Sequence, residues 1–442
     1  MARRRKAGRL LVFLNSRLVG QLNQEASGAI DFRYDTTWLS WEHTMPVSLS
    51  LPLREDRYIG PPVSTVFDNL LPDNAAIRKT VAERVGAAGT DPFSLLSALG
   101  RDCVGALQFL SDDEEPGPAG ATKGRLLSDA QIAGLLDSLA RNPLGVNRDE
   151  DFRISIAGAQ EKTALLRQGG KWRKPIGATP TTHILKPQIG QLPNGIDLSN
   201  SVENEYFCLT FTKALDLPSA GVEIARFGKK RVLVVERFDR HMTRDKRLLR
   251  VPQEDFCQAL SVPWTRKYES EGGPGVRDIL KLLAGSDEAG TDRRNFLKAN
   301  IVFWLLAATD GHAKNFSLFL APGGGYRMTP LYDVVSAQPS LVSGQIQAKQ
   351  MKLAMAVGDS HHYKIGRITG RHFLQSAESA GAGRDMALGV IDEVLETAPR
   401  ALEKVFKKLP NGFPAKLAHT IAGGVHERLV QLEKNRPTLK RH

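Results

Sequence analysis

The chain has no long run of apolar residues, and only 3 of its 442 residues are cysteines. A membrane-spanning helix needs about 20 consecutive, mostly apolar residues, so the sequence predicts neither such a helix nor a membrane partner. Cys103, Cys208 and Cys257 are odd in number, widely spaced and embedded in apolar segments, which argues against a disulfide framework and a zinc site. We expect them to be reduced core thiols of a cytoplasmic protein.

The chain also lacks a histidine cluster suited to a metal and a recognisable signal peptide. Its start, MARRRKAGRLLVFLNSRLVG, is basic, but the apolar stretch is short and no small-residue cleavage site follows. Positive charge is abundant instead, because 60 Lys and Arg against 48 Asp and Glu give a net charge of +12. This balance indicates an acidic partner such as nucleic acid, nucleotide or an acidic protein, although a solvated basic surface has the same composition.

Two carboxylates and one amide form the strongest functional pattern. Residues 309–315 read TDGHAKN, and the spacing of Asp310 and Asn315 is that of a phosphotransfer catalytic loop. In such a loop the carboxylate receives or orients the proton of the attacking hydroxyl, and the amide oxygen holds Mg²⁺. Asp333, a further hard oxygen ligand, is placed to bridge the metal and the nucleotide phosphates. The alternative is that Asp310 and Asn315 only cap turns.

A hairpin is expected between these groups. Residues 316–320 and 326–329 have the pattern of two short strands joined by Ala-Pro-Gly-Gly-Gly. Such a hairpin would bring its ends together and place Asp333 beside Asn315. Upstream, residues 295–308 are apolar nearly all round, as expected of a buried helix that delivers a polar loop.

The first half of the chain offers a candidate phosphate clamp. The predicted strand 181–186 ends in Lys186, and the following helix carries Glu203 and Glu205. Kinases use a strand lysine held by a helix glutamate to place an ammonium over the phosphates, whereas the alternative is a snorkelling lysine at a strand end. Residues 155–162 (SIAGAQEK) are small enough for backbone N–H groups to approach phosphate, but a plain hairpin turn fits them equally well.

A candidate adenine hinge follows the next apolar strand. Glu236, Arg237 and Phe238 close that strand, and such a strand end can recognise adenine through its backbone, with Phe238 beside the ring. A charged strand terminus is the simpler explanation of the same residues. His312 and Lys314 lie inside the catalytic segment and could touch phosphate, although a lone histidine is more often structural.

The pattern along the chain changes from strand-rich to helical. Strands are predicted at 10–14, 18–22, 30–34, 152–156, 163–167, 181–186, 222–227 and 231–236. Helices are predicted within 64–99, at 128–139 behind a Ser128 N-cap, at 201–215, 254–260, 275–284, 293–308, 371–379, 386–406 and 415–433, with a surface loop at 112–125. This order fits an α+β, two-lobed nucleotide-binding enzyme. We divide it into an N-terminal α/β subdomain (1–125), a nucleotide-binding α/β part (126–250) and a mostly helical lobe with the catalytic and metal-binding loops (251–442).

Several stretches together resemble the HipA serine/threonine kinase toxins of bacterial HipBA toxin–antitoxin modules. They run in the family's order over most of the chain: FDNLLPD (67–73), DFRIS and AGAQEKTALL (within 151–166), TPTTHI (179–184), VERFDR (235–240), VPQED (251–255), KYESEGGPG (267–275), ATDGHAKNFS (308–317), PLYDVVSA (330–337) and KLAM (352–355). The resemblance implies a protein-kinase-like fold related to phosphatidylinositol kinases, with a mixed α/β N-terminal lobe, a mostly helical C-terminal lobe, and bound ATP and Mg²⁺.

The resemblance also implies roles for individual residues. Asp310 would be the catalytic base, Asn315 and Asp333 the Mg²⁺ ligands, and Ser155 the site of an autophosphorylation that switches the enzyme off. Lys186, paired to Glu205, would contact the phosphates. The other expected ATP-binding residues are Ala157, Gly158, Ala159, Gln160, Glu161, Lys162, Glu236, Arg237, Phe238, His312, Ala313, Lys314 and Tyr332.

The family's partners are implied in the same way. They are a HipB-like helix-turn-helix antitoxin, operator DNA bound through the antitoxin complex, and glutamyl-tRNA synthetase, whose phosphorylation near its ATP site arrests growth and promotes persistence. One departure is that residues 375–381, QSAESAG, contain no Lys or Arg, so this helix is not expected to touch DNA directly. The alternatives are a kinase of another protein, a lipid or a small molecule on the same fold, or a non-catalytic corepressor.

Overall fold

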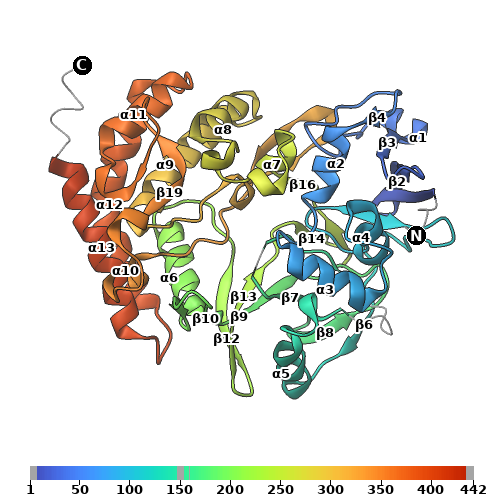
Figure 1. Cartoon of the computed structure of the whole chain (residues 1–442), viewed down its shortest axis with the longest axis horizontal. Helices are drawn as coiled ribbons and strands as arrows, with labels where there is room; N and C mark the ends of the chain where they lie inside the picture. Colours follow the sequence, from blue (N-terminus) through green and yellow to red (C-terminus); the bar gives the residue numbers. More distant parts are fainter. Residues whose placement is uncertain (1–6, 147–153, 159, 435–442) are drawn as a thin grey trace. The chain divides into compact units, whose positions relative to one another are not determined.

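The computed structural model describes residues 7–146, 154–158 and 160–434 (Figure 1). The chain divides into two compact units, each built from segments that are far apart in the sequence. Unit 1 consists of Met1–Pro187, Arg226–Thr265 and Leu318–Tyr326, and unit 2 of Gln188–Ala225, Arg266–Ser317 and Arg327–His442. The division of the sequence into 1–125, 126–250 and 251–442 stays a prediction.

Unit 1 begins with an antiparallel sheet in the order β4-β3-β2-β1-β5. Its strands are β1 (Gly8–Leu14), β2 (Arg17–Gln24), β3 (Ile30–Tyr34), β4 (Tyr58–Ile59) and β5 (Leu107–Leu110). Asn15 and Ser16 join β1 to β2 with φ of 46° and 70°, the left-handed turn that matches strand twist. Helices α1 (Thr36–Leu39), α2 (Pro61–Asp68), α3 (Ala75–Val85) and α4 (Pro92–Leu99) contribute to the core, in which Phe32, Trp38 and Phe67 are fully buried. The three predicted N-terminal strands and the helical stretch are confirmed.

A second sheet has the order β12-β13-β9-β7-β8-β6. Its strands are β6 (Gly124–Leu126), β7 (Thr163–Gln168), β8 (Lys171–Pro175), β9 (His183–Pro187), β12 (Val222–Phe227) and β13 (Lys230–Glu236), and helix α5 (Asp129–Ser138) follows β6. Ser128 caps α5, as the sequence predicts, and the structure adds a capping box with Gln131. In the centre, β9 pairs antiparallel with β7 and β13. Figure 1 shows these strands in green.

The predicted strand at 152–156 is wrong over its described residues. Residues 152 and 153 lie outside the described part, and residues 154–156 form no strand. Ile154 and Ile156 are buried because this segment packs into the core of unit 1, and the backbone N–H of Ser155 donates to the carbonyl of Asp102 at 3.0 Å. Alternating apolar residues here reflect burial of an irregular segment, so the loop 155–162 is not a turn between two strands.

Unit 2 is mainly helical. Its helices of five or more residues are α6 (Ser201–Ala214), α8 (Val276–Leu282), α9 (Ala289–Leu306), α10 (Gln338–Val342), α11 (Gly370–Ser379), α12 (Arg384–Lys408) and α13 (Ala415–Lys434). Helix α9 is buried continuously from Phe296 to Leu306, as predicted, and it contacts α12 and α13. Beyond residue 252 the sequence predicts mostly helices besides the hairpin, and it missed three short strands: β16 (Gln253–Asp255) in unit 1, and β19 (Lys352–Val357) and β20 (His362–Lys364) in unit 2. Short strands of this length carry little periodic signal.

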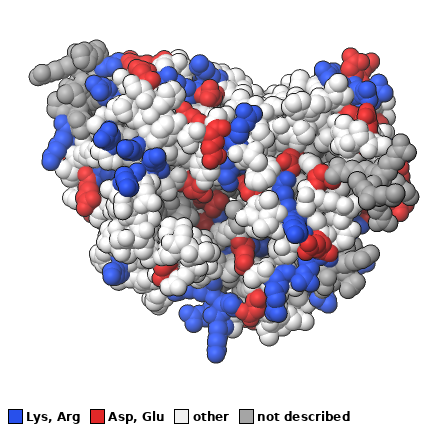
Figure 2. All heavy atoms as spheres, viewed as in Figure 1, with Lys and Arg blue, Asp and Glu red and all other residues white. Residues whose placement is uncertain are grey.

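The three cysteines are buried, as expected, and form no disulfide with one another in the structure. Burial raises the pKa of the Cys103 thiol to about 12, so it is a core group rather than a reactive one. Among the described residues, no helix is long and apolar enough to cross a membrane. Figure 2 shows basic and acidic side chains interspersed on the face that it presents.

Candidate active site

The candidate catalytic segment 309–315 follows directly after the end of helix α9. Ala307 ends the helix in the left-handed conformation, with φ of 52°, and the backbone N–H of Ala308 donates to the carbonyl of Phe303 at 2.8 Å. Such a C-cap satisfies the last carbonyls and turns the chain sharply away from the helix axis. The buried helix therefore delivers the polar segment from a rigid base.

Hydrogen bonds within the segment tie Asp310 to Asn315. The side-chain Nδ2 of Asn315 donates to the backbone carbonyl of Asp310 at 2.7 Å. The backbone N–H groups of His312 and Asn315 donate to the carbonyls of Asp310 and His312, each at 2.9 Å. Because Nδ2 is engaged, Oδ1 is the atom that Asn315 can offer to a cation. The Asp310 side chain is 62% exposed, and Asn315 is buried.

Aromatic side chains pack against this loop from helix α9 and from the residue that follows the loop. A Cβ added at Gly311 would lie 2.4 Å from Cδ2 of Phe303, so only glycine fits there without displacing the ring. Phe303 stacks on Phe316 with the ring centroids 5.3 Å apart. His312 is buried, and its Nε2 lies 3.8 Å from Oδ1 of Asp310. The close contact between Gly311 and Phe303 fixes the distance between the loop and helix α9.

The hairpin after the loop is confirmed. Strands β17 (Ser317–Leu320) and β18 (Tyr326–Met328) are neighbours in one sheet, and the backbone N–H of Thr329 donates to the carbonyl of Ser317 at 2.9 Å. The Tyr332 hydroxyl donates to the carbonyl of Lys314 at 2.8 Å and lies 2.5 Å from Oγ of Ser317. These bonds bring the residues next to Asn315 and the residue before Asp333 together.

Asp333 itself has an unusual backbone. Its φ is 57°, a left-handed conformation that few residues other than glycine adopt and that aspartate tolerates better than most. The preceding segment is held by Leu331, whose N–H donates to the carbonyl of Pro218 at 2.8 Å. Strained conformations of this kind are found at functional sites more often than elsewhere.

The donor set fits magnesium. The described residues contain no group of three or more His, Cys, Asp and Glu that could hold a metal. Asn315 and Asp333 would offer two hard oxygen ligands. Mg²⁺ is commonly bound by one or two protein oxygens, with water and substrate phosphates completing its coordination.

Lys186 and Glu205 are buried charged residues in different units. Lys186 lies in β9 opposite Leu233 of β13 and is 6% exposed. Glu205 lies in α6 and is 3% exposed. Charged side chains are rarely buried to this extent without partners. The ion pair between them stays a prediction.

The candidate phosphate loop is held by side chains of its own unit. Ser155 is fully buried, and its Oγ donates to the carbonyl of Leu70 at 2.7 Å. The Lys162 ammonium donates to the carbonyl of Ala157 at 2.7 Å, and Gly158, with φ of 103°, has no room for a Cβ beside that ammonium. Further on, Gln160 donates to the carbonyl of Pro187 at 3.2 Å and Glu161 is exposed, while Ala159 lies outside the described residues.

The candidate hinge uses backbone and aromatic contacts. Glu236 ends β13 as an exposed residue, and the N–H of Arg237 donates to the carbonyl of Thr182 at 2.9 Å. Phe238 meets Phe319 edge to face, with the ring centroids 5.8 Å apart. The Arg237 side chain forms part of a buried cluster, so this residue could offer only its backbone to a nucleotide.

Sequence reasoning did not identify that cluster, the Asp102 cluster, which consists of Asp102, Arg237, Asp239, Arg240 and Arg250. Asp102 contacts Arg240 at 2.8 Å, Arg250 at 3.2 Å and Arg237 at 3.3 Å. Burial alone would raise the pKa of Asp102, but the three guanidiniums hold it well below its usual range. Asp239 accepts from Arg237 at 2.7 Å. The alternating charges in VERFDR were a local sign of an ion-pair cluster. The residues around Asp102 give no comparable sign that it belongs to the cluster.

Tyr268 is a second residue that sequence reasoning missed. Its hydroxyl donates to Oδ1 of Asp310, and its ring meets the His312 ring edge to face with the centroids 5.0 Å apart. In the sequence, its stretch KYESEGGPG indicated the family but no role for the tyrosine. Its tyrosine therefore joins the candidate site on geometry alone.

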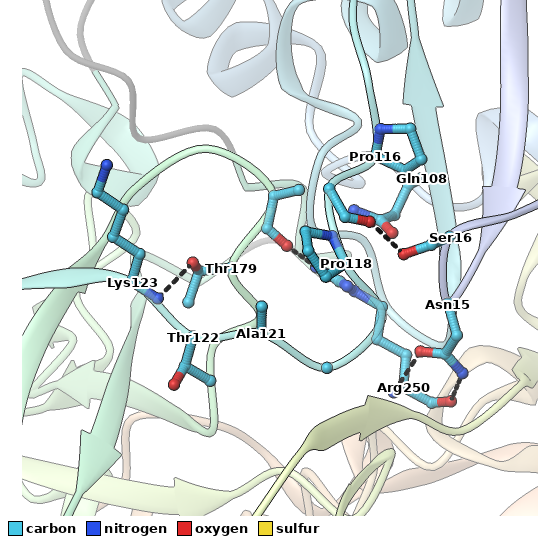
Figure 3. Close-up of a pocket in the computed structure, with 13 residues that line it drawn as sticks. Asn15, Ser16, Gln108, Pro116, Pro118, Ala121, Thr122, Lys123, Thr179 and Arg250 are labelled. Carbon is cyan, nitrogen blue, oxygen red and sulfur yellow. Dashed lines mark hydrogen bonds between the residues drawn. The ribbon is translucent and has the colours of Figure 1, made fainter.

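Unit 1 also contains a cavity of about 210 Å³, shown in Figure 3. Arg250 and Asn15 lie on one side, and each end of the Asn15 amide bonds to the Arg250 backbone at 2.9 Å. Thr179 accepts the backbone N–H of Lys123 at 2.9 Å. None of the described residues predicted for the active site lines this cavity.

Comparison with known proteins decides the family. Residues 10–110 match the model of the HipA N-terminal domain, and residues 154–402 match the HipA-like C-terminal domain. The second match alone covers more than half of the chain. The chain belongs to the HipA family.

Individual relatives agree with this assignment. The putative kinase Y4mE of Sinorhizobium fredii is 36% identical over 404 residues, which is 89% of this chain and 92% of that protein. The serine/threonine-protein kinase toxin HipA of Shewanella oneidensis is 27% identical over 421 residues, 91% of this chain and 90% of that protein. The structure of a complex of Shewanella oneidensis HipA, HipB and operator DNA contains a chain that matches with a TM-score of 0.79 at 25% identity, covering 96% of this chain and 97% of that one.

These findings confirm the resemblance and the α+β, two-lobed kinase-like fold. The enzyme class is that of a serine/threonine-protein kinase, of the HipA type that serves as a toxin in toxin–antitoxin systems. A kinase draws its phosphoryl group from a nucleotide, so the nucleotide requirement follows from the class. The individual site residues remain predictions.

Proposed function

We propose that this HipA-family protein is an ATP- and Mg²⁺-dependent kinase that phosphorylates serine or threonine of a protein and acts as the toxin of a toxin–antitoxin pair. The observation that carries the proposal is the closed loop in which the Asn315 amide bonds to the backbone of Asp310 and leaves the Asp310 carboxylate exposed. An exposed carboxylate beside an oriented amide oxygen matches the catalytic loop of kinases.

The chemistry assigned to the residues is direct. Asp310 accepts the proton of the acceptor hydroxyl while that oxygen bonds to the γ-phosphorus and ADP leaves. Asn315 and Asp333 would hold Mg²⁺, which would neutralise charge on the phosphates. Lys186 and the backbone of the loop 155–162 contact the phosphates, and Glu236 to Phe238 contact adenine.

Replacing Asp310 with Asn tests the base. Positioned general bases contribute about 10²- to 10⁴-fold, so autophosphorylation with radiolabelled ATP should fall by at least about 100-fold. The melting temperature should hold, because the side chain is 62% exposed. Asp359→Asn is the matched control, since Asp359 is also 60% exposed in unit 2, where it pairs with Arg277. Full activity in Asp310→Asn would remove Asp310 from the mechanism.

Ser155 is the proposed site of self-inactivation. Its hydroxyl is fully buried against the Leu70 carbonyl, and a phosphate would add about −1.5 to −2 charges there. Neither the volume nor the charge of a phosphate fits this buried position. Phosphorylation would therefore expel the loop and remove its backbone from the nucleotide. Ser155→Ala should therefore stay active on prolonged incubation with ATP. It should also carry about one phosphate per chain fewer than the wild type.

Thr163→Val is the control for Ser155→Ala. It removes another buried hydroxyl of unit 1, which donates to the Leu144 carbonyl at 2.7 Å, without a predicted change in phosphate content. Mass spectrometry after incubation with ATP gives the stoichiometry. An unchanged phosphate content in Ser155→Ala would reject Ser155 as the modified residue.

The biological partners are part of the proposal. A HipB-like helix-turn-helix antitoxin and operator DNA are supported by the Shewanella complex, and glutamyl-tRNA synthetase is the proposed protein substrate in the cytoplasm. Helix α11 carries Arg371 but no Lys or Arg from residue 375 to its end at Ser379, so DNA contact is assigned to the antitoxin complex rather than to this part of the helix. Phosphoproteomics of cells expressing the chain tests the substrate. A phosphorylated lipid or metabolite without a phosphoprotein would favour a kinase of lipids or small molecules. Toxicity of an Asp333→Ala variant would favour a non-catalytic corepressor.

A further inference from the structure

The loop at residues 266–273 is folded tightly on itself in unit 2. The carbonyl of Tyr268 accepts the backbone N–H groups of Glu271 at 3.0 Å and Gly273 at 2.9 Å, and the N–H of Gly272 donates to the carbonyl of Glu269 at 3.0 Å. A Cβ added at Gly273 would lie 2.1 Å from the carbonyl oxygen of Arg266. The loop is therefore closed in a way that depends on glycine, and Tyr268 projects from a fixed backbone.

Two anchors attach this loop to its surroundings. The Glu269 carboxylate accepts the backbone N–H of Ala356 in β19 and lies 3.1 Å from Nδ1 of His361. On the other side, the N–H of Ala313 in the catalytic segment donates to the carbonyl of Lys267 at 3.4 Å. The loop thus connects β19 directly to the segment that carries Asp310.

Tyr268 is held against Asp310 by its neighbours. The hydroxyl donates to Oδ1 of Asp310, the ring packs edge to face on buried His312 at 5.0 Å, and the Lys267 ammonium lies 5.8 Å from the ring centroid. An exposed carboxylate such as that of Asp310 would otherwise exchange between rotamers and water. A phenol fixed by packing removes that freedom.

We propose that Tyr268 is a positioning residue that holds the Asp310 carboxylate in the orientation needed to take the acceptor proton. The inference rests on the proposed role of Asp310 as the base. Tyr268 keeps its own proton throughout, and the acceptor proton goes to Asp310. Function requires supporting groups of this kind because misorientation of a base by a fraction of an ångström costs rate.

Tyr268→Phe is the test, because it deletes only the hydroxyl and keeps the ring on His312. We expect kcat to fall about tenfold, the effect of losing one hydrogen bond to a charged group, with KM for ATP unchanged. Tyr206→Phe is the matched control. It removes another unit 2 hydroxyl, one that donates to the Lys408 carbonyl at 3.3 Å, and should leave kcat unchanged.

A second background separates positioning from a general structural effect. In Asp310→Glu the carboxylate sits one methylene further out, so Tyr268 no longer meets it in the same place. Adding Tyr268→Phe there should reduce kcat by less than about twofold, because residues that act through one another are not additive. Gly273→Ala, which displaces the loop but keeps the hydroxyl, should lower kcat as Tyr268→Phe does.

The outcomes are distinguishable. A wild-type kcat in Tyr268→Phe, or the same tenfold loss in the Asp310→Glu background, would overturn the inference while leaving the proposed function intact. Full activity in Asp310→Asn would overturn the proposed function and the inference with it. If Tyr268→Phe lowered the melting temperature sharply, the Gly273→Ala kinetics would decide instead, and a wild-type kcat there would count against Tyr268.

Discussion

Replacing Asp102 with Asn should destabilise unit 1 more than any exposed charge change. Asp102 is fully buried and accepts from three guanidiniums and from both the backbone N–H and the hydroxyl of Thr181, at 3.0 and 2.7 Å. Asparagine keeps the shape but removes the charge. The Asp102 cluster would then hold Arg237, Arg240 and Arg250 with Asp239 as its one carboxylate.

The expected magnitude follows from the burial. Removing one partner of a buried ion pair costs about 3–5 kcal/mol, because the remaining charge is left without compensation. The matched control is Asp112→Asn, whose pair with Arg9 at 2.7 Å is half exposed. Exposed pairs are worth about 0–1 kcal/mol, so the two substitutions should differ several-fold in their effect on the free energy of unfolding.

Urea unfolding followed by tryptophan fluorescence is a suitable assay, since four of the five tryptophans lie in unit 1: Trp38, Trp41, Trp172 and Trp264. The pKa of Asp102 is lower in the folded chain than the value of about 3.9 in the unfolded one. Its contribution is therefore fully present above about pH 4 and is lost as the pH falls below it. An Asp102→Asn loss below about 1 kcal/mol at pH 7 would refute the coupling of the cluster.

Two further predictions concern a buried glutamate and the catalytic loop. Glu254 is fully buried, accepts the N–H of Leu49 at 2.8 Å, and has its pKa raised by burial to about 8. A raised pKa gives stability that is present below about pH 4.3 and lost as the pH rises through about 8. The melting temperature of Glu254→Gln should therefore rise relative to that of the wild type between pH 5 and pH 9. A difference between the two melting temperatures that does not widen over this range would contradict the prediction. Gly311→Ala should lower kcat more than about tenfold by forcing its methyl into Phe303. The control is Gly290→Ala in α9, where a Cβ meets nothing within 4 Å and kcat should be unchanged.

Long periodic segments could be predicted from the sequence. The buried helix before the candidate catalytic loop was found because residues 295–308 are apolar nearly all round. The hairpin after Asn315 was found because its glycine turn is explicit. The segment around Ser155 was misassigned as a strand, since buried isoleucines flank a residue whose backbone bonds to Asp102 rather than to a strand.

Contacts between residues far apart in the sequence could not be predicted. Asp102 lies 135 residues from Arg237 and 148 from Arg250, and no local pattern marks such partners. Tyr268 lies 42 residues from Asp310, and no local pattern in residues 267–275 marks a contact with that carboxylate. Only the folded structure shows that the glycines allow this loop to close on itself, and that Tyr268 then contacts the Asp310 carboxylate.

The Asp102 cluster has a practical consequence for truncation. The match to the N-terminal domain, 10–110, contains Asp102, whereas the match to the C-terminal domain, 154–402, contains all three of its arginines. A fragment that starts at residue 154 would bury three guanidiniums beside a single acid, and we expect it to aggregate on expression. Co-expression with a separate peptide covering 10–110 should rescue its solubility, because the missing anion would then be supplied in trans.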